Sequence, residues 1–279
     1  MLEALQFEFF RNALLAGLMA SIICGVIGSL VVVNRIVFLA GGIAHAAYGG
    51  IGLSFFFGWP YMAGTVGFAL VAAMVMALVT LRLKHRSDTV IGVIWALGMA
   101  IGIILLDLTP GYNVDLMSYL FGSILAVPGS DLLQMFIAST AILITLLSFY
   151  RGFLAMSYDE EFARLRGVPV GLFYFVMIGM IAVSVVITIR VVGLILVIAL
   201  LTIPPFIAER YAGSLATMMA VSAVLGALFT CAGLWLSYSA NLTSGAAIIL
   251  VAGVCFFLAI GVDKLRSSFR TRKPEPRTP

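Results

Sequence analysis

The sequence predicts an all-α polytopic membrane protein with about eight or nine transmembrane helices and one short polar helix. The chain has 279 residues, of which 63% are hydrophobic and only 10% charged, whereas soluble domains carry about 25% charged residues. Residues 12–33, 171–189 and 211–262 contain no charged side chain, and a spanning helix needs about 20 apolar residues. The period-two alternation of a β-barrel is absent, which leaves helices to satisfy the backbone in lipid.

The apolar runs give the expected spans in chain order. We expect them at about 12–33, 36–58, 61–81, 89–106, 128–150, 170–189, 191–208, 214–237 and 244–262. Residues 116–127 are apolar but too short to cross, so we expect a re-entrant or partly inserted helix there. Residues 1–262 form one predicted membrane domain, and the basic, proline-rich residues 263–279 form a tail expected to be disordered at its end.

One interior stretch, from Ser157 to Pro169, has the composition of a helix exposed to water. Ser157 and Glu160 match a capping box. The acidic residues come first and the arginines last, as the helix dipole favours. Gly167 is placed to end the helix, and Pro169 to prevent its continuation. We therefore predict a self-capped helix at about 157–167.

Apolar Phe162 and Leu165 lie on one side of this predicted helix. An apolar pair on a capped helix between two membrane spans is consistent with a docking site for a soluble partner protein. A loop helix that is merely solvated explains the same residues, and the sequence leaves both interpretations open.

The positive charges indicate an orientation. If residues 157–167 are cytoplasmic, 14 of the 16 Lys and Arg residues share that side, and only Arg11 and Arg190 lie opposite. The positive-inside rule then predicts the N-terminus outside and the C-terminus in the cytoplasm. The outer carboxylates would concentrate cations in a negative vestibule, or serve solvation alone. The net charge of +4 comes from the loops and tail and indicates no nucleic-acid partner.

His45 is the one histidine or charged residue between Ile36 and Leu81. Ionisable groups inside a membrane are functional candidates by default, and imidazole is a common ligand of zinc, copper, iron and nickel. Nearby glycines weaken the helix and admit a cavity or another helix. These glycines are Gly41, Gly42, Gly49 and Gly50. The alternative is a structural histidine that is hydrogen-bonded between packed helices.

Other candidates surround this histidine less closely. Asp107 and Asp115, near the predicted outer surface, are possible metal co-ligands. Glu209 is another, but adjacent Arg210 and its inner position favour a solvated helix end. Pro204 and Pro205 must kink or end their helix, either as a hinge or as a terminus.

Motifs for enzymatic chemistry are absent from the sequence. It contains no G-x-x-x-x-G-K-[ST] phosphate loop, no H-E-x-x-H and no G-x-S-x-G. The chain therefore cannot itself bind ATP through such a loop, and nothing in the sequence supports an intramembrane metalloprotease or an acyl hydrolase. The three cysteines lie inside apolar runs, which indicates neither a disulfide framework nor a cysteine metal site.

Five stretches, in this order, resemble the membrane subunit of the bacterial ABC-type zinc/manganese/iron importers, the ABC-3 family. Residues around His45 resemble its G-D-A-L-S-H-A-x-x-P-G motif, and residues 115–122 its D-L-x-S-Y-L-F-G. Residues 158–170 resemble F-D-x-E-x-A-x-x-x-G-x-x-V, residues 192–204 resemble V-G-x-L-L-V-x-A-L-L-x-I-P, and residues 244–246 match S-G-A. The likeness extends over nearly the whole chain, to about residue 262.

The resemblance implies a homodimeric permease in a bacterial or archaeal inner membrane that works by alternating access. It also implies a cytoplasmic ATP-binding subunit on each copy and a metal-binding protein outside. Residues 157–167 would be the coupling helix that seats in the ATPase. The residues expected at that contact are Tyr158, Asp159, Glu161, Phe162, Arg164, Leu165 and Gly167. His45 would line the metal path, and no cofactor would be bound by the chain itself.

The sequence departs from the family pattern at two positions. Gly41 replaces the family's aspartate four residues before His45, and Gly49 replaces its proline. Loss of that carboxylate removes a hard ligand one turn from the imidazole. Manganese prefers carboxylates whereas imidazole suits zinc, so we expect zinc, with manganese or iron as the other possibilities.

Two other transport functions stay open on the sequence. A stand-alone cation channel or secondary metal carrier would use the same histidine and carboxylates without a partner. The shortage of charged residues in the spans argues against a proton-coupled carrier. An importer of organic metal chelates is expected to be a longer chain with a wider cavity.

Overall fold

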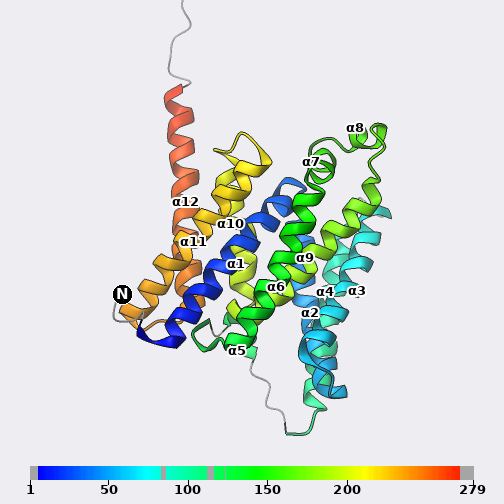
Figure 1. Cartoon of the computed structure of the whole chain (residues 1–279), viewed down its shortest axis with the longest axis vertical. Coiled ribbons are helices and arrows are strands. Elements are labelled where there is room, and N and C mark those ends of the chain that lie inside the picture. Colours follow the sequence, from blue (N-terminus) through cyan, green and yellow to red (C-terminus); the bar gives the residue numbers. More distant parts are fainter. Residues whose placement is uncertain (1–5, 83–85, 112–115, 123, 271–279) are drawn as a thin grey trace, which may run out of the picture.

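The computed structural model describes residues 6–82, 86–111, 116–122 and 124–270, and every regular element within these residues is a helix (Figure 1). Among the described residues, eight helices are long and apolar enough to cross a membrane. They are α1 (Glu8–Val33), α2 (Val37–Phe57), α3 (Tyr61–Arg82), α4 (Ser87–Asp107), α6 (Gly129–Ser148), α9 (Val170–Val192), α11 (Leu215–Ala240) and α12 (Ser244–Arg270). The predicted all-α membrane fold is confirmed.

The shorter elements fill the gaps between these spans. They are α5 (Leu116–Phe121), the 3₁₀ turn η2 (Ile124–Ala126), α7 (Tyr150–Tyr158), α8 (Glu160–Leu165) and α10 (Leu194–Glu209). The apolar stretch 116–127 therefore holds two short helical pieces, and neither is long enough to span a bilayer. The predicted span at 191–208 corresponds to α10, an apolar helix of only 16 residues.

A backbone contact between two glycines lets α10 start inside the bundle. Gly193 separates α9 from α10 with φ of 83°, and Gly122, after α5, has φ of 69°. A Cβ atom on Gly193 would lie 2.9 Å from the Cα of Gly122, so both the conformation and the approach require glycine. Pro204 and Pro205 lie buried within α10, which continues beyond them to Glu209.

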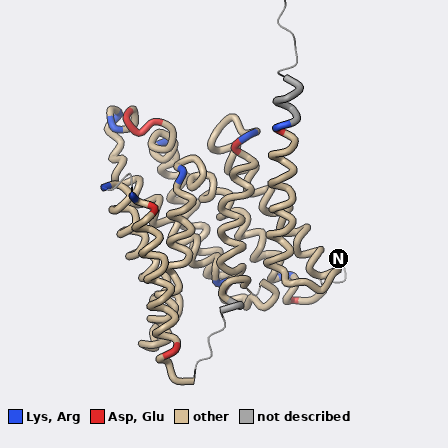
Figure 2. The backbone as a smooth tube through the Cα atoms, turned by 180° about the vertical axis from the view of Figure 1, so that it is seen from behind, with Lys and Arg blue, Asp and Glu red and all other residues tan. Residues whose placement is uncertain are grey.

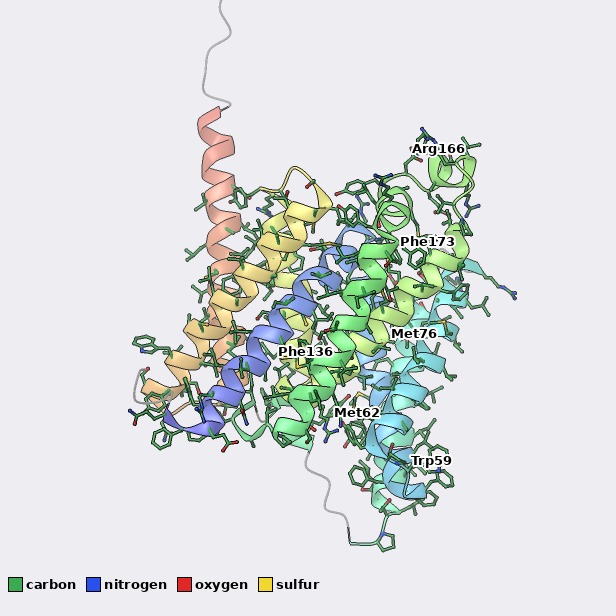
Figure 3. The ribbon with its side chains drawn as sticks, viewed as in Figure 1. Trp59, Met62, Met76, Phe136, Arg166 and Phe173 are labelled. Carbon is green, nitrogen blue, oxygen red and sulfur yellow. The ribbon has the colours of Figure 1, made fainter. Side chains whose placement is uncertain are left out.

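The spans differ in how much of their surface faces outward. α1 and α2 are the most enclosed, whereas α4, α6 and α12 are the least. On α6, Phe136 points away from the bundle and is 60% exposed, as suits contact with lipid (Figure 3). The α1–α11 contact contains small polar pairs, Ser21 with Thr230 at 3.0 Å and Ser29 with Ser222 at 3.3 Å. Such residues let transmembrane helices approach closely.

The charged residues lie mainly at the helix ends and in the loops (Figure 2). The end that carries α8 also carries the start of α4, the end of α10 and the end of α12 (Figure 1). Trp59, between α2 and α3, lies at the opposite end from Arg166, which follows α8 (Figure 3).

At the Trp59 end, an ion pair joins two spans to each other. Arg190 of α9 donates to a carboxylate oxygen of Asp131 on α6 at 2.9 Å, and Asp131 is only 8% exposed. The Arg190 guanidinium carbon also lies 4.9 Å from the ring centroid of Tyr61 on α3.

At the C-terminal end of the sequence, α12 continues through residue 263, where the tail was predicted to begin. Residues 271–279 of that tail lie outside the described residues.

Candidate functional site

His45 lies on α2 with its imidazole stacked on the indole ring of Trp95 from α4. The ring centroids are 4.0 Å apart and the planes differ by 15°. Nδ1 of His45 is buried and has no hydrogen-bond partner among the described residues. A purely structural histidine would be expected to bond at this atom, because an unsatisfied buried polar group costs about 1–3 kcal/mol. The structure therefore lacks the hydrogen bond at Nδ1 that the interpretation as a structural histidine predicts.

A second aromatic side chain holds the backbone next to His45. Tyr119 of α5 donates its hydroxyl hydrogen to the carbonyl oxygen of Ala44 at 2.9 Å. Its ring packs edge-on against Tyr48, one turn further along α2, with centroids 4.7 Å apart. The short helix α5 thus contacts α2 at two points beside His45, the backbone carbonyl of Ala44 and the side chain of Tyr48. Sequence reasoning did not single out Trp95 or Tyr119, although Tyr119 lies within the motif-like stretch 115–122.

Three of the four glycines predicted for the path contact neighbouring helices. A Cβ on Gly42 would lie 2.6 Å from Ile91, one on Gly49 2.9 Å from the carbonyl of Gly98, and one on Gly50 2.7 Å from the backbone of α3. Gly41 differs, because a Cβ there would meet no atom within 4 Å. Of these four glycines, Gly41 is therefore the one with open space beside it. It lies on the same face of α2 as His45, four residues earlier.

Of the two predicted co-ligands, the structure describes Asp107, and this residue does not lie beside His45. Asp107, the last residue of α4, follows Trp95 by 12 residues, which is about 18 Å along the helix axis. Asp107 is therefore well removed from the imidazole. Asp115 lies outside the described residues. In the part of the chain that the structure describes, no group of three or more His, Cys, Asp or Glu residues could hold a metal ion.

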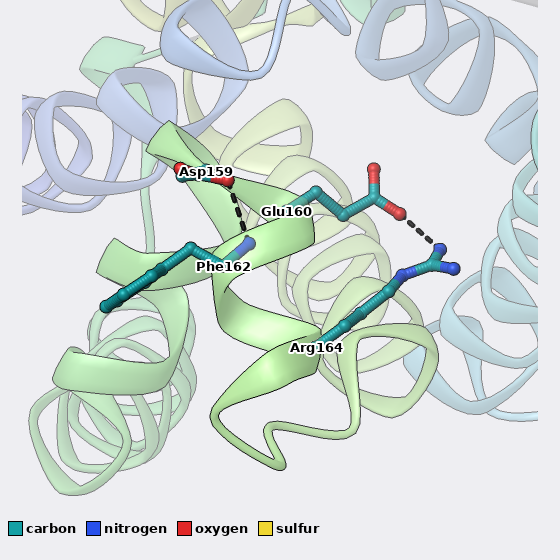
Figure 4. Close-up of polar contacts among 4 residues, drawn as sticks. All are labelled: Asp159, Glu160, Phe162 and Arg164. Atoms are coloured by element: carbon teal, nitrogen blue, oxygen red, sulfur yellow. Dashed lines mark hydrogen bonds and ion pairs between the residues drawn. The ribbon is translucent and has the colours of Figure 1, made fainter.

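The polar helix is shorter than predicted, and its first cap is a different residue. The predicted helix at 157–167 is wrong at its start: the chain breaks at Asp159, which is extended with φ of −150°, and α8 begins at Glu160. Asp159 Oδ1 accepts a hydrogen bond from the backbone N–H of Phe162 at 2.9 Å (Figure 4). Ser157 lies inside α7, and its Oγ accepts from Nδ2 of Asn34 at 2.9 Å. Glu160 does not complete a capping box but pairs with Arg164.

The end of α8 forms as the glycine predicts. Gly167 has φ of 79°, its N–H donates to the carbonyl of Arg164, and the N–H of Val168 donates to that of Ala163, both at 3.0 Å. These two bonds make a Schellman motif. Ala163 is fully buried and anchors the helix on the bundle.

The remaining side chains of α8 point outward. Leu165 is 88% exposed, and Phe162 is 48% exposed with the Arg166 guanidinium carbon 4.9 Å from its ring centroid. Tyr158, at the end of α7, is 62% exposed. Three exposed apolar or aromatic side chains, Tyr158, Phe162 and Leu165, thus lie within eight residues of one another at the charged end of the molecule.

Comparison with known proteins gives one family. The sequence profile of the ABC 3 transport family matches residues 6–263. An uncharacterized membrane protein of Synechocystis is 50% identical over 260 residues, which cover 93% of this chain and 92% of the relative. The manganese transport system membrane protein MntC of Listeria monocytogenes is 31% identical and covers 91% of both chains. Among solved structures, PsaBC from Streptococcus pneumoniae in complex with Fab matches with a TM-score of 0.84 and 32% identity, covering 92% of this chain and 93% of that chain.

Proposed function

Because the chain belongs to the ABC 3 transport family, we propose that it is the permease subunit of an ATP-driven importer of divalent metal cations. The observation that carries the coupling role is α8, which is capped at both ends and presents an 88% exposed Leu165. A separate ATPase would seat on this surface. Such a partner would supply the ATP site that the sequence lacks.

The metal path in this proposal passes His45. A single chain offers one unpartnered imidazole nitrogen there, stacked on Trp95. Tight metal sites in proteins use several ligands. In a two-fold homodimer with His45 beside the axis, two imidazoles would meet at one site, and a site with few ligands would release its cargo easily, as conduction requires. Alternating access would then open the path to one side at a time.

The orientation proposed here places α8 in the cytoplasm of a bacterial cell, with the N-terminus outside and the C-terminus inside. The positive charges at the α8 end support it. Residues 1–262 would form the membrane domain, and a metal-binding protein would deliver the cation at the Trp59 end.

Two considerations bear on which cation is carried. MntC of Listeria is named for manganese transport, and this supports Mn²⁺. The imidazole of His45, with Gly41 in place of a carboxylate one turn away, supports Zn²⁺. We propose that both cations enter the path and compete for it, so that selectivity is set largely by the protein that delivers them.

Reconstitution into liposomes tests the proposal. The chain is combined with its ATPase and metal-binding protein, and uptake of radioactive manganese and zinc is followed with and without ATP. We expect ATP-dependent uptake of both, each inhibited by the other. His45→Ala is expected to abolish uptake while the complex still assembles.

A further variant separates coupling from conduction. Glu161→Arg reverses a charge in the first turn of α8 without touching the bundle, and it is expected to leave ATP hydrolysis intact while uptake fails. Uptake that proceeds without the ATPase would instead indicate a channel or secondary carrier and would refute the proposal.

A further inference from the structure

The short helix α7 lies across the ends of two spans at the α8 end of the molecule. Figure 1 shows α7 nearly end-on, whereas α6 and α9 run lengthwise in the same view. Phe153 and Met156 of α7 are buried against the bundle, while Arg151 is exposed. Beside α7, Leu147 of α6 and Leu172 of α9 are 71% and 61% exposed, as suits contact with lipid. An amphipathic helix in this position lies at the level of the lipid headgroups.

Two adjoining cavities open beside α7, one with a polar wall and one without. The first, of about 380 Å³, is lined by residues 147–152 at the α6–α7 junction and by Phe173 of α9. The second, of about 80 Å³, is lined only by apolar side chains, among them Phe153 and Val176. Phe149 and Phe173 line both cavities, so the polar cavity leads into the apolar one.

Close packing of aromatic side chains forms the wall that the cavities share. The ring centroid of Phe173 lies 6.0 Å from that of Phe149 and 5.1 Å from that of Phe153, both in edge-on arrangements. A Cβ atom on Gly152 would overlap the Phe173 ring, so this approach of α7 to α9 requires glycine. The shared wall is therefore a packed part of the bundle.

Arg151 is the one charged residue on the walls of these two cavities. It has no ion-pair partner in the described part of the chain. Ser148 and Tyr150 add hydroxyl groups to the same wall, and the polar cavity lies at the first turn of α7, where the helix dipole is positive. A guanidinium with hydroxyl donors suits a phosphate group. Because these walls carry no carboxylate, a cationic headgroup such as ethanolamine would find no partner on them.

We propose that the two cavities bind one anionic phospholipid of the phosphatidylglycerol type, with its phosphate on Arg151 and part of an acyl chain against Phe149 and Phe173. The apolar cavity favours a lipid over a free phosphate, because a free anion would leave that cavity unfilled. In the proposed orientation this lipid belongs to the cytoplasmic leaflet. Since α7 leads into α8 through Asp159 alone, the bound lipid would steady the base of the surface proposed for the ATPase.

Native mass spectrometry of the purified full chain in detergent tests this site. Phosphatidylglycerol and phosphatidylethanolamine with the same acyl chains are titrated in turn, and the dissociation constant of each complex with one lipid is measured. We expect phosphatidylglycerol to bind about fivefold more tightly, because one arginine near the membrane surface contributes about that factor. Arg151→Gln should weaken phosphatidylglycerol binding about fivefold and remove the preference.

Arg82→Gln is the matched control for charge. Arg82 is the last residue of α3, is exposed at the same end of the molecule and lines neither cavity, so its replacement should leave both dissociation constants unchanged. Val176→Phe fills the apolar cavity and should weaken both lipids alike. Glycerophosphoglycerol, the headgroup without acyl chains, should not displace phosphatidylglycerol when added in excess. Circular dichroism checks that each variant is folded, and the exposed Arg151→Gln decides the matter if Val176→Phe is not.

Several outcomes would overturn the lipid site. One is equal affinity of the parent chain for the two lipids, and another is the same loss in Arg82→Gln as in Arg151→Gln. Displacement by glycerophosphoglycerol, or unchanged binding in a folded Val176→Phe variant, would show an anion site that takes no acyl chain. A second copy of the chain over this face would appear as a dimer whose lipid binding does not respond to Arg151→Gln, and this also would refute the proposal.

Discussion

Replacing Gly41 by aspartate is expected to tighten metal binding at the proposed His45 site. Gly41 precedes His45 by four residues, so the two side chains would lie on one face of α2 with Cβ atoms about 5–6 Å apart. A Cβ at this position meets no atom within 4 Å. The new carboxylate thus has room to approach a cation held by the imidazole.

The magnitude follows from charge and from helix propensity. Glycine and aspartate differ by only a few tenths of a kcal/mol in a helix interior, so the fold should be nearly unaffected. A carboxylate about 5 Å from a dication gains about 7 kcal/mol at an effective dielectric constant of about 20, and lost hydration removes much of that gain. We expect binding to become at least about tenfold tighter, or about 1.4 kcal/mol.

Titration of purified protein with Mn²⁺, followed by electron paramagnetic resonance of the free ion, measures this gain. Gly41→Asn is the matched control, because it has the same shape without the charge. Uptake should slow in Gly41→Asp at saturating metal, since a site that binds more tightly releases more slowly. The reasoning requires His45 to be a ligand. A gain of the same size in the Gly41→Asp, His45→Ala double variant, or in Gly41→Asn, would refute it.

Three other perturbations test separate contacts. Leu165→Asp should weaken association with the ATPase at least about tenfold, measured by co-purification, because it charges the most exposed apolar residue of α8. Arg190→Met should lower the free energy of unfolding in detergent by about 3 kcal/mol, because Asp131 is left nearly buried and unpaired; an unchanged denaturation midpoint would contradict this. Asn34→Leu removes the hydrogen bond to Ser157 and should lower the number of metal ions imported per ATP hydrolysed, with no change in complex assembly.

The spans could be predicted from the sequence because lipid permits few solutions. The run at residues 170–189 became α9 (Val170–Val192), for example, since a charge-free stretch of this length must satisfy its own backbone as a helix. The boundary at Gly193 was less predictable. It depends on close contact with Gly122, far away in sequence, and no local pattern reveals that approach.

The site shows the same division between local and long-range information. The glycine end of α8 follows from local chemistry, and the structure has it at Gly167. The start of α8 does not follow from local chemistry. Ser157 accepts a hydrogen bond from Asn34 in the α1–α2 loop, and Asp159 caps the helix in its place. Likewise His45 could be predicted as a candidate because it is the one ionisable residue in an apolar span. Its stacking partner Trp95 could not, because that contact depends on how α2 packs on α4.

The contact that displaced the predicted cap also suggests how α8 reaches the metal path. Asn34 holds Ser157 of α7 and, through the same amide nitrogen, the carbonyl of Leu30 at the end of α1. Three residues later α2 begins, and it carries His45. A movement of α7 and α8 imposed by an ATPase would therefore act on the start of α2 through this half-buried contact at Asn34. Coupling of this kind requires an element with two states. A double-mutant cycle between Asn34→Leu and Glu161→Arg measures it, because purely additive losses of uptake would show that the two positions act independently.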